Sequence, residues 1–174
     1  MKKIILASLF AASGIYADVQ LNKPLPHITL ASNQGGYVNG KPWDSSMLKG
    51  KTTMLMYVDP DEKDKGEAFK PTIEMLEKKM NFKKFQILVI LNLKATWKPS
   101  ALIKKLTKGK LSDYPKRIYV FDNDTVLVNK WGLKNDAYNT LVIDTQMKPI
   151  YSHTGTWKEG EITKIYHLIQ NHAK

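Results

Sequence analysis

Two nearly unbroken apolar runs divide the chain into regular units. Thr52–Val58 and residues 85–91 are apolar and β-branched almost throughout, which is typical of strands covered on both faces. After the first run, apolar residues recur at helical spacing and predict a helix over residues 67–80. After the second run, a helix is expected to open at Pro99 and to stop at Gly109. The pattern therefore predicts two consecutive strand–helix units.

Shorter apolar segments fill the rest of the chain. Near the N-terminus, turn-forming residues separate extended pieces at 28–30 and 37–38, which are expected to form a hairpin. Residues 126–132 form an ambiguous segment. Later strands are expected over residues 118–121, 141–144 and 149–152. Helical spacing predicts a closing helix from Ile162, Ile165, Tyr166 and Ile169.

The order of these elements predicts one domain over residues 18–174. Parallel strand–helix units, a hairpin and a terminal helix describe an α/β sandwich, in which a central mixed sheet carries helices on both faces. No repeat, linker or low-complexity tract interrupts this part of the chain. Its 157 residues (174 less 17) are enough to bury one core.

The first seventeen residues have the pattern of an export signal. Lys2 and Lys3 precede an apolar stretch over residues 4–15 and a small-residue cleavage site that ends at Ala17. The stretch is shorter than the roughly 20 residues that a spanning helix needs. We therefore expect cleavage, a mature chain that starts at Asp18 without a membrane span, and a periplasmic location.

Composition narrows the classes of function. The chain has no cysteine, so it cannot form a disulfide and has no thiol that could act as a nucleophile. Its formal charge of +11 favours anionic partners, and export argues against nucleic acid as a partner. Arg117 is the only arginine, and lysines attract anions without the bidentate geometry of a guanidinium. The expected partner is an envelope protein or an anionic envelope component.

An acidic stretch at residues 59–67 is the main candidate for cation binding. Its spacing departs from a calcium loop, because Lys63 and Asp64 stand where an oxygen ligand and the turn glycine belong. A solvated helix start, where carboxylates meet free backbone donors, is the preferred interpretation. The four histidines show no ligand spacing and no nucleotide-binding motif occurs, so no cofactor is predicted.

Residues 23–30 and 48–51 resemble motifs of exported thiol-disulfide proteins and peroxiredoxins, which have a thioredoxin-like fold. The resemblance implies redox cysteines directly after the first buried strand, where this chain reads DPDEKDKGE over residues 59–67. It also implies a cis-proline before a later strand, at a position that Tyr138 or a neighbour occupies. Both halves of the redox site are missing, so neither a thiol-disulfide oxidoreductase nor a peroxiredoxin is expected.

A second set of motifs extends over nearly the whole mature chain. Its members are residues 41–45, 48–51, 89–92, 114–115, 121–122 and 131–133. These motifs resemble the YtfJ-like family of periplasmic proteins, which is itself thioredoxin-like and usually lacks the paired thiols. The most specific part is the segment from Trp43 to Lys51. The resemblance implies a fold and a compartment, but it supplies no established activity.

These resemblances suggest a groove at the degenerate redox position. Its expected residues are Trp43, Asp59, Pro60, Asp61, Glu67 and Tyr138. The preferred hypothesis is a non-catalytic binding or interaction protein that keeps this groove for recognition. The alternative is a redox-associated enzyme or electron carrier with a bound flavin, haem or metal, because several tryptophans and tyrosines could line an aromatic groove. A third hypothesis is attachment to anionic envelope material through lysine-rich faces.

Overall fold

The computed structural model describes residues 18–173 and builds them around a six-stranded mixed sheet, so the expected export signal lies outside the described residues. The strand order is β2-β6-β5-β4-β7-β8; β4, β5 and β6 are parallel, and the other neighbours are antiparallel. Strands β1 and β3 form a separate pair. The strands are β1 (Thr29–Leu30), β2 (Gly35–Tyr37), β3 (Trp43–Asp44), β4 (Thr52–Val58), β5 (Phe85–Asn92), β6 (Arg117–Asp122), β7 (Tyr138–Ile143) and β8 (Pro149–Thr154).

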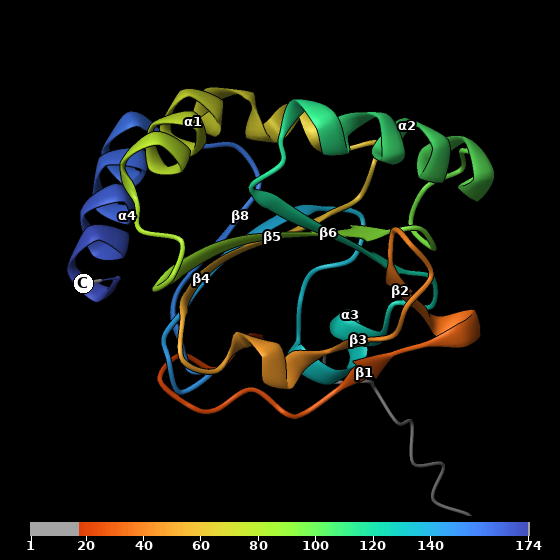
Figure 1. The fold of residues 1–174 in the computed structure, drawn as a ribbon, viewed down its shortest axis with the longest axis horizontal. Coiled ribbons are helices and arrows are strands. Elements are labelled where there is room, and N and C mark those ends of the chain that lie inside the picture. The colour runs from red at the N-terminus through yellow and green to blue at the C-terminus, as the bar shows by residue number, and fades with distance from the viewer. Residues whose placement is uncertain (1–17, 174) are drawn as a thin grey trace, which may run out of the picture.

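Helices cover both faces of the sheet, which confirms the predicted sandwich. Figure 1 shows α1, α2 and α4 above the sheet, and α3 with the β1–β3 pair below it. None of the helices within residues 18–173 combines the length and the apolar character needed to cross a bilayer. The helices are α1 (Lys70–Lys79), α2 (Ser100–Asp113), α3 (Val126–Trp131) and α4 (Glu159–His172), with 3₁₀ helices η1 (Ser32–Gln34), η2 (Ser45–Leu48) and η3 (Lys63–Phe69).

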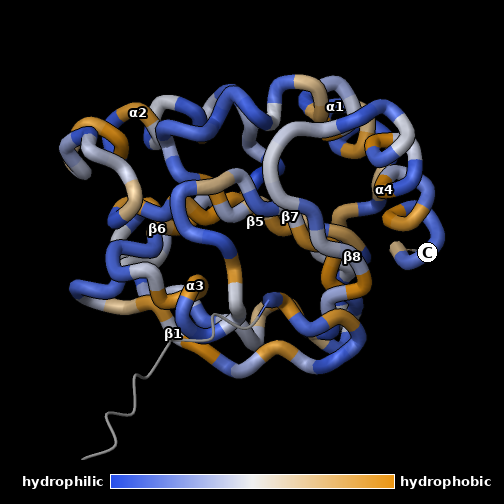
Figure 2. Tube along the Cα trace, turned by 180° about the vertical axis from the view of Figure 1, so that it is seen from behind, coloured by the Kyte–Doolittle hydropathy of each residue, from blue (hydrophilic) through white to orange (hydrophobic). Residues whose placement is uncertain are grey.

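Strand β4 contributes side chains to the two larger hydrophobic cores. All seven of its residues are buried, because β5 and β7 flank it and helices cover both faces. Successive side chains of a strand point to opposite faces. Met54 and Met56 therefore enter the upper core with α1 and α4, whereas Leu55 and Tyr57 enter the lower core with α3. In Figure 2 the central strands are correspondingly hydrophobic, between more polar outer segments.

The helix after β4 begins later than its spacing predicted. Residues 63–69 form the 3₁₀ helix η3, and α1 starts only at Lys70. Pro71 explains the difference, because a proline lacks the backbone donor that an α-helix needs beyond its first turn. The segment at the candidate site is therefore a tight 3₁₀ helix and not the first turn of an α-helix.

The expectation that Gly109 ends the next helix was wrong. Helix α2 continues to Asp113, and Gly109 is absent from the residues with positive φ. A helical glycine costs about 1 kcal/mol relative to alanine, which the surrounding helix tolerates. The ambiguous segment proves to be helix α3, which Gly132 terminates at a left-handed φ of 72°.

The predicted N-terminal hairpin was also wrong. Strand β1 pairs with β3, with Leu30 opposite Trp43, whereas β2 pairs with β6 at the edge of the main sheet. Gly35 allows this approach, since a Cβ atom there would lie 1.9 Å from the carbonyl oxygen of Phe121. The edge of β6 offers unpaired backbone hydrogen-bonding groups, and β2 pairs with them instead of forming the hairpin that local spacing predicts.

A buried carboxylate fastens α3 to the sheet. Asp122 ends β6 with no exposed surface, and its side chain accepts hydrogen bonds from the Tyr57 hydroxyl at 3.1 Å and from the amides of Val126 and Leu127, both at 3.0 Å. It also accepts from the Asp124 amide at 3.1 Å. Helix α3 has no capping side chain at Thr125, so Asp122 satisfies its first donors instead.

Replacing this carboxylate should be costly. In Asp122→Asn one acceptor oxygen becomes a donor, which leaves buried donors unpaired, so we expect the free energy of unfolding to fall by about 2–4 kcal/mol. Urea denaturation measures the change. The control is Asp113→Asn at the exposed end of α2, where a change within about 0.5 kcal/mol is expected. Equal midpoints for the two variants would contradict this role of Asp122.

Candidate functional site

The candidate site lies where the parallel strands end. The carboxyl ends of β4 and β5 meet at one edge of the sheet, which is where open α/β sheets usually bind ligands. The acidic stretch follows β4 at this edge. Asp59 is only 4% exposed, and its carboxylate accepts the Asp61 amide at 2.8 Å. Burial raises the pKa of Asp59, and the neighbouring carboxylate of Asp61 adds to the shift. Asp59 therefore shapes the turn.

Asp61 ties this turn to the next loop. Its carboxylate forms an ion pair with Lys98 and accepts the Thr96 hydroxyl at 2.7 Å. These contacts lower the pKa of Asp61. Both acids are thus engaged by neighbouring groups of the protein. Within residues 18–173, no group of three or more His, Asp or Glu side chains is arranged to hold a metal ion.

A cavity of about 430 Å³ opens beside this turn on the upper face. Its lining residues come from the sheet, which forms the floor, and from two walls, η3 with the start of α1 on one side and α2 on the other. Figure 1 shows α1 and α2 next to each other above the sheet. This volume falls in the range of small-molecule sites. The lining residues are Met56, Val58, Pro60, Lys63, Gly66, Glu67, Lys70, Ile73, Val89, Leu91, Lys98, Ile103, Leu106, Thr107, Lys110, Tyr114, Arg117, Tyr119 and Tyr138.

Positive side chains predominate in this lining. Four lysines and Arg117 accompany a single acid, Glu67. Lys63 and Lys98 pair with the acidic stretch, through Asp64 at 2.8 Å and through Asp61. Among the ion pairs of the described residues, none involves the other two lysines, Lys70 and Lys110. The cavity therefore offers two lysine charges that no carboxylate of the described chain contacts.

Arg117 is held rigidly at the β6 side of the cavity. Its Nε and Nη2 donate to the two carboxylate oxygens of Glu77 at 2.6 and 3.2 Å, and its guanidinium lies 3.8 Å from the centre of the Tyr114 ring. A bidentate, stacked guanidinium is strongly oriented. The only arginine of the chain is thus fixed in the cavity wall, a role that its isolation in the sequence did not suggest.

Tyr138 begins β7, at or beside the position where the fold resemblance implies a cis-proline. Its hydroxyl lies 3.1 Å from the Met56 sulfur, and burial raises the pKa of Tyr138 to about 12. The phenol is consequently neutral at ordinary pH. Its ring lies against Gly66 of η3, where a Cβ atom would approach ring carbons to 2.5 Å. The ring of Tyr138 thus packs against η3 at the start of the segment that follows β4.

Alanine substitutions at two glycines test this contact. Gly66→Ala should lower the free energy of unfolding by about 1–3 kcal/mol, because the new methyl group collides with the buried Tyr138 ring. Gly109→Ala is the matched control: nothing lies within 4 Å of its Cβ position, so the helix should gain about 0.5–1 kcal/mol. Chemical denaturation measures both changes. A neutral Gly66→Ala variant would contradict the packing described.

Trp43 does not belong to this cavity. It is 1% exposed and packs in the lower core, where its ring centre lies 6.3 Å from that of Trp131. The indole of Trp131 is anchored in turn by a 2.8 Å hydrogen bond to the Pro26 carbonyl. The sheet separates Trp43 from Tyr138, because these side chains lie in different cores. Only Pro60, Glu67 and Tyr138 of the expected groove residues line the cavity.

The other tryptophans do not form a shared aromatic groove either. Trp157 stacks on Phe69 in the upper core with ring centres 4.3 Å apart, outside the cavity lining. Trp97 is 83% exposed in the loop before α2. The four tryptophans are divided between the two larger cores and the surface, as ordinary core packing would have it, and do not line one aromatic groove.

A row of buried polar side chains crosses the lower face near the same edge. Besides Tyr57 and Asp122 it includes Asn92, which donates to the Asn135 side chain at 2.8 Å, and Asn139, which donates to the Lys134 carbonyl at 2.9 Å. Nothing in the local spacing of these residues indicates that they form a group. Both asparagines form hydrogen bonds to the loop that precedes Tyr138, and they therefore fix the position of this loop at the edge of the sheet where the cavity lies.

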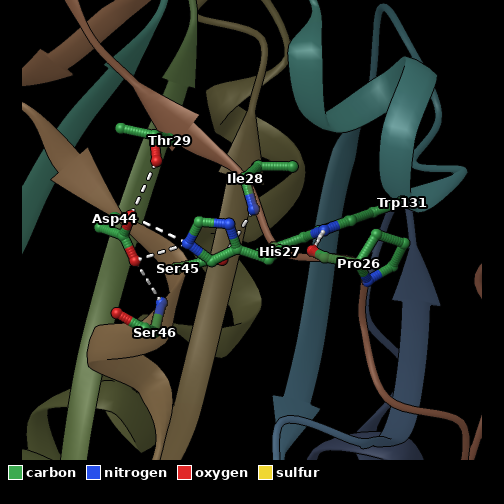
Figure 3. A network of polar contacts seen from close by, with 8 residues as sticks. All are labelled: Pro26, His27, Ile28, Thr29, Asp44, Ser45, Ser46 and Trp131. Carbon is green, nitrogen blue, oxygen red and sulfur yellow. Dashed lines mark hydrogen bonds and ion pairs between the residues drawn. The ribbon is translucent and has the colours of Figure 1, made fainter.

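A separate polar network joins β1 to β3 on the surface (Figure 3). Asp44 accepts hydrogen bonds from the Thr29 hydroxyl at 2.7 Å and the Ser46 amide at 2.9 Å, and His27 Nε2 lies 2.9 Å from its carboxylate. The Ser45 hydroxyl accepts the Ile28 amide at 3.0 Å. This serine is turned to the backbone and not to the histidine, so the arrangement is structural, not a catalytic triad.

Acid should loosen this network. The hydrogen bonds to the carboxylate, from Ser46 first and then Thr29, lower the pKa of Asp44. A carboxylate whose pKa falls on folding stabilises the protein above the unfolded value of about 4, and this contribution is lost as the pH falls below it. We expect wild type to melt above Asp44→Asn at pH 6 and the difference in Tm to shrink by pH 3. A difference independent of pH would oppose this assignment.

The fold and the cavity define a class: thioredoxin-like domains without the thiol pair. The chain is similar to the crystal structure of a putative thiol:disulfide interchange protein DsbE from Chlorobium tepidum. The TM-score is 0.65 and the sequence identity 16%, and the match covers 90% of this chain and 100% of that chain. The putative protein disulfide isomerase of Bacteroides thetaiotaomicron gives 0.65 and 19% over 89% and 91%. The exposed lipoprotein thioredoxin Etrx1 of Streptococcus pneumoniae gives 0.61 and 19% over 82% and 99%. At such identities the likeness shows the fold alone.

The family is more specific than the fold. Residues 19–172 match the family described as "Bacterial protein of unknown function (YtfJ_HI0045)". The chain belongs to this family, as its motifs predicted. No curated protein sequence matches it.

Proposed function

We propose that this protein is a non-catalytic binding protein of the bacterial periplasm that recognises its ligand or partner at the cavity beside η3. The cavity itself carries the proposal, because it lies at the edge where the fold resemblance places redox cysteines. The chain has no cysteine to perform that chemistry, and Tyr138, at or beside the position of the implied proline, packs against Gly66. Binding of a ligand or partner at this edge of the sheet requires no thiol, whereas redox chemistry of the kind that the resemblance implies does.

The periplasmic location is part of the proposal. It is supported by the signal-like pattern of the first seventeen residues. One structurally similar protein, Etrx1 of Streptococcus pneumoniae, is an "exposed lipoprotein thioredoxin", which agrees with a location outside the cytoplasm. An envelope protein or an anionic envelope component is the partner that we propose, since the chain carries a formal charge of +11.

The side chains near the cavity favour binding over catalysis. The acids of the β4–η3 turn are engaged in the turn itself and with Lys98. His27 and His153 lie in contacts of their own, with Asp44 at 2.9 Å and with the Thr156 carbonyl at 3.0 Å, and neither lines the cavity. No cavity-lining residue pairs a nucleophile with a histidine base, the arrangement that nucleophilic catalysis commonly uses.

A charge reversal at the cavity tests the proposal. Lys70→Glu changes a lining residue, whereas Lys78→Glu changes an exposed lysine of α1 outside the lining. We expect material retained by wild-type protein from periplasmic extract to fall at least about fivefold with Lys70→Glu and to persist with Lys78→Glu, since nearby charge governs such attraction. Quantitative mass spectrometry of proteins and small molecules measures the retained material.

The proposal would be contradicted if Lys70→Glu and Lys78→Glu reduced the amount of retained material equally. A visible absorption spectrum of the natively purified protein then separates the cofactor alternative. Absorption by a bound flavin or haem would favour a redox-associated role over simple recognition, and metal analysis of the same sample extends this test to colourless ions.

A further inference from the structure

The cavity has an apolar floor and a charged mouth. The floor is made of upper-face side chains from neighbouring strands, including Met56 and Val58 of β4 and Val89 and Leu91 of β5. Strand residues two apart share a face, so these four form one continuous apolar surface. A ligand that rests there must bring apolar surface of its own to replace water.

The mouth is basic and draws its charges from different elements. Lys70 belongs to α1 and Lys110 to α2, on opposite walls. No carboxylate pairs with either within residues 18–173, and Glu67 is the only acid of the lining. The charge that complements this arrangement is a single anionic group held between the two walls.

The α2 wall is incompletely packed. Of its fourteen residues only Ile103 and Thr107 are buried. Leu106 lines the cavity yet remains 57% exposed, one turn before Lys110. Residues four apart lie on the same face of a helix. An apolar side chain and a lysine charge without an ion-pair partner among the described residues therefore stand together on this wall.

We propose that the cavity binds a single-chain amphiphilic anion, an acyl or alkyl chain that ends in a carboxylate or phosphate. The chain lies on the floor against Leu106, and the anionic head lies between Lys70 and Lys110. The inference rests on the proposed binding function and specifies its ligand class. A free fatty acid and a lipid with one chain and a phosphate head share this chemistry.

A homologous series tests the apolar part. Octanoate, decanoate and dodecanoate, each below its critical micelle concentration, are titrated into the untagged protein that starts at Asp18, and isothermal titration calorimetry measures binding. Each pair of added methylenes should tighten Kd by about tenfold until the floor is covered. Dodecyl phosphate distinguishes the two head groups. Decanol, which has the same chain length as decanoate without its charge, should bind at least about fivefold more weakly, and only the anions should weaken with added salt.

Variants of α2 locate the ligand. Leu106→Gln should reduce the dependence of affinity on chain length, and Lys110→Gln should reduce the preference for decanoate over decanol by about threefold or more. Leu102→Gln and Lys105→Gln are matched controls on the same helix: both residues are exposed and outside the lining. All four positions are exposed, so the variants should fold, which thermal unfolding verifies.

Two results would overturn the inference. One is the absence of saturable binding by every anion of the series. The other is an equal loss of affinity for the anions in Leu106→Gln and Leu102→Gln, because the ligand would then contact the outer face of α2. The same two variants are compared for binding to vesicles that contain phosphatidylglycerol, where an equal loss has the same meaning. In either case a difference between Lys70→Glu and Lys78→Glu in retention from extract would leave the proposed binding function intact and remove only its ligand class.

Discussion

The position of β4 between β5 and β7 is the constraint on which the remaining structure depends. It buries all seven strand residues and assigns alternate side chains to opposite cores. Met56 thereby reaches Tyr138 above the sheet, while Tyr57 reaches Asp122 below it. One strand therefore supports both the candidate cavity and the polar row that positions its edge.

The polar row is notable in a chain without disulfides. Asp122 replaces a helix cap, and Asn92 and Asn139 hold the loop before β7. Buried hydrogen bonds contribute modestly when they are made and cost much when they are broken. Such groups favour one arrangement of α3 and the preceding loop over alternatives that would leave them unpaired. They also keep Tyr138 against Gly66 without a covalent link.

The sheet edge that follows β4 is a packed corner beside a cavity. The contact of Tyr138 with Gly66 fills one side, and the acidic turn is tied to the next loop by Asp61 and Lys98. What stays open is the space between η3 and α2, with an apolar floor and lysines on both walls.

The sequence by itself determined the central strands, the mixed sandwich and the family, because unbroken apolar runs and local motifs depend little on distant residues. The resemblance to thiol-disulfide proteins pointed to the sheet edge that includes Pro60, Glu67 and Tyr138, three residues that line the cavity. Only the tertiary structure placed Trp43 in the opposite core, paired β2 with β6, and gathered Lys70, Lys110 and Arg117 around one cavity. Those outcomes depend on which face of the sheet each side chain enters and on how distant segments pack, and neither is encoded in local spacing.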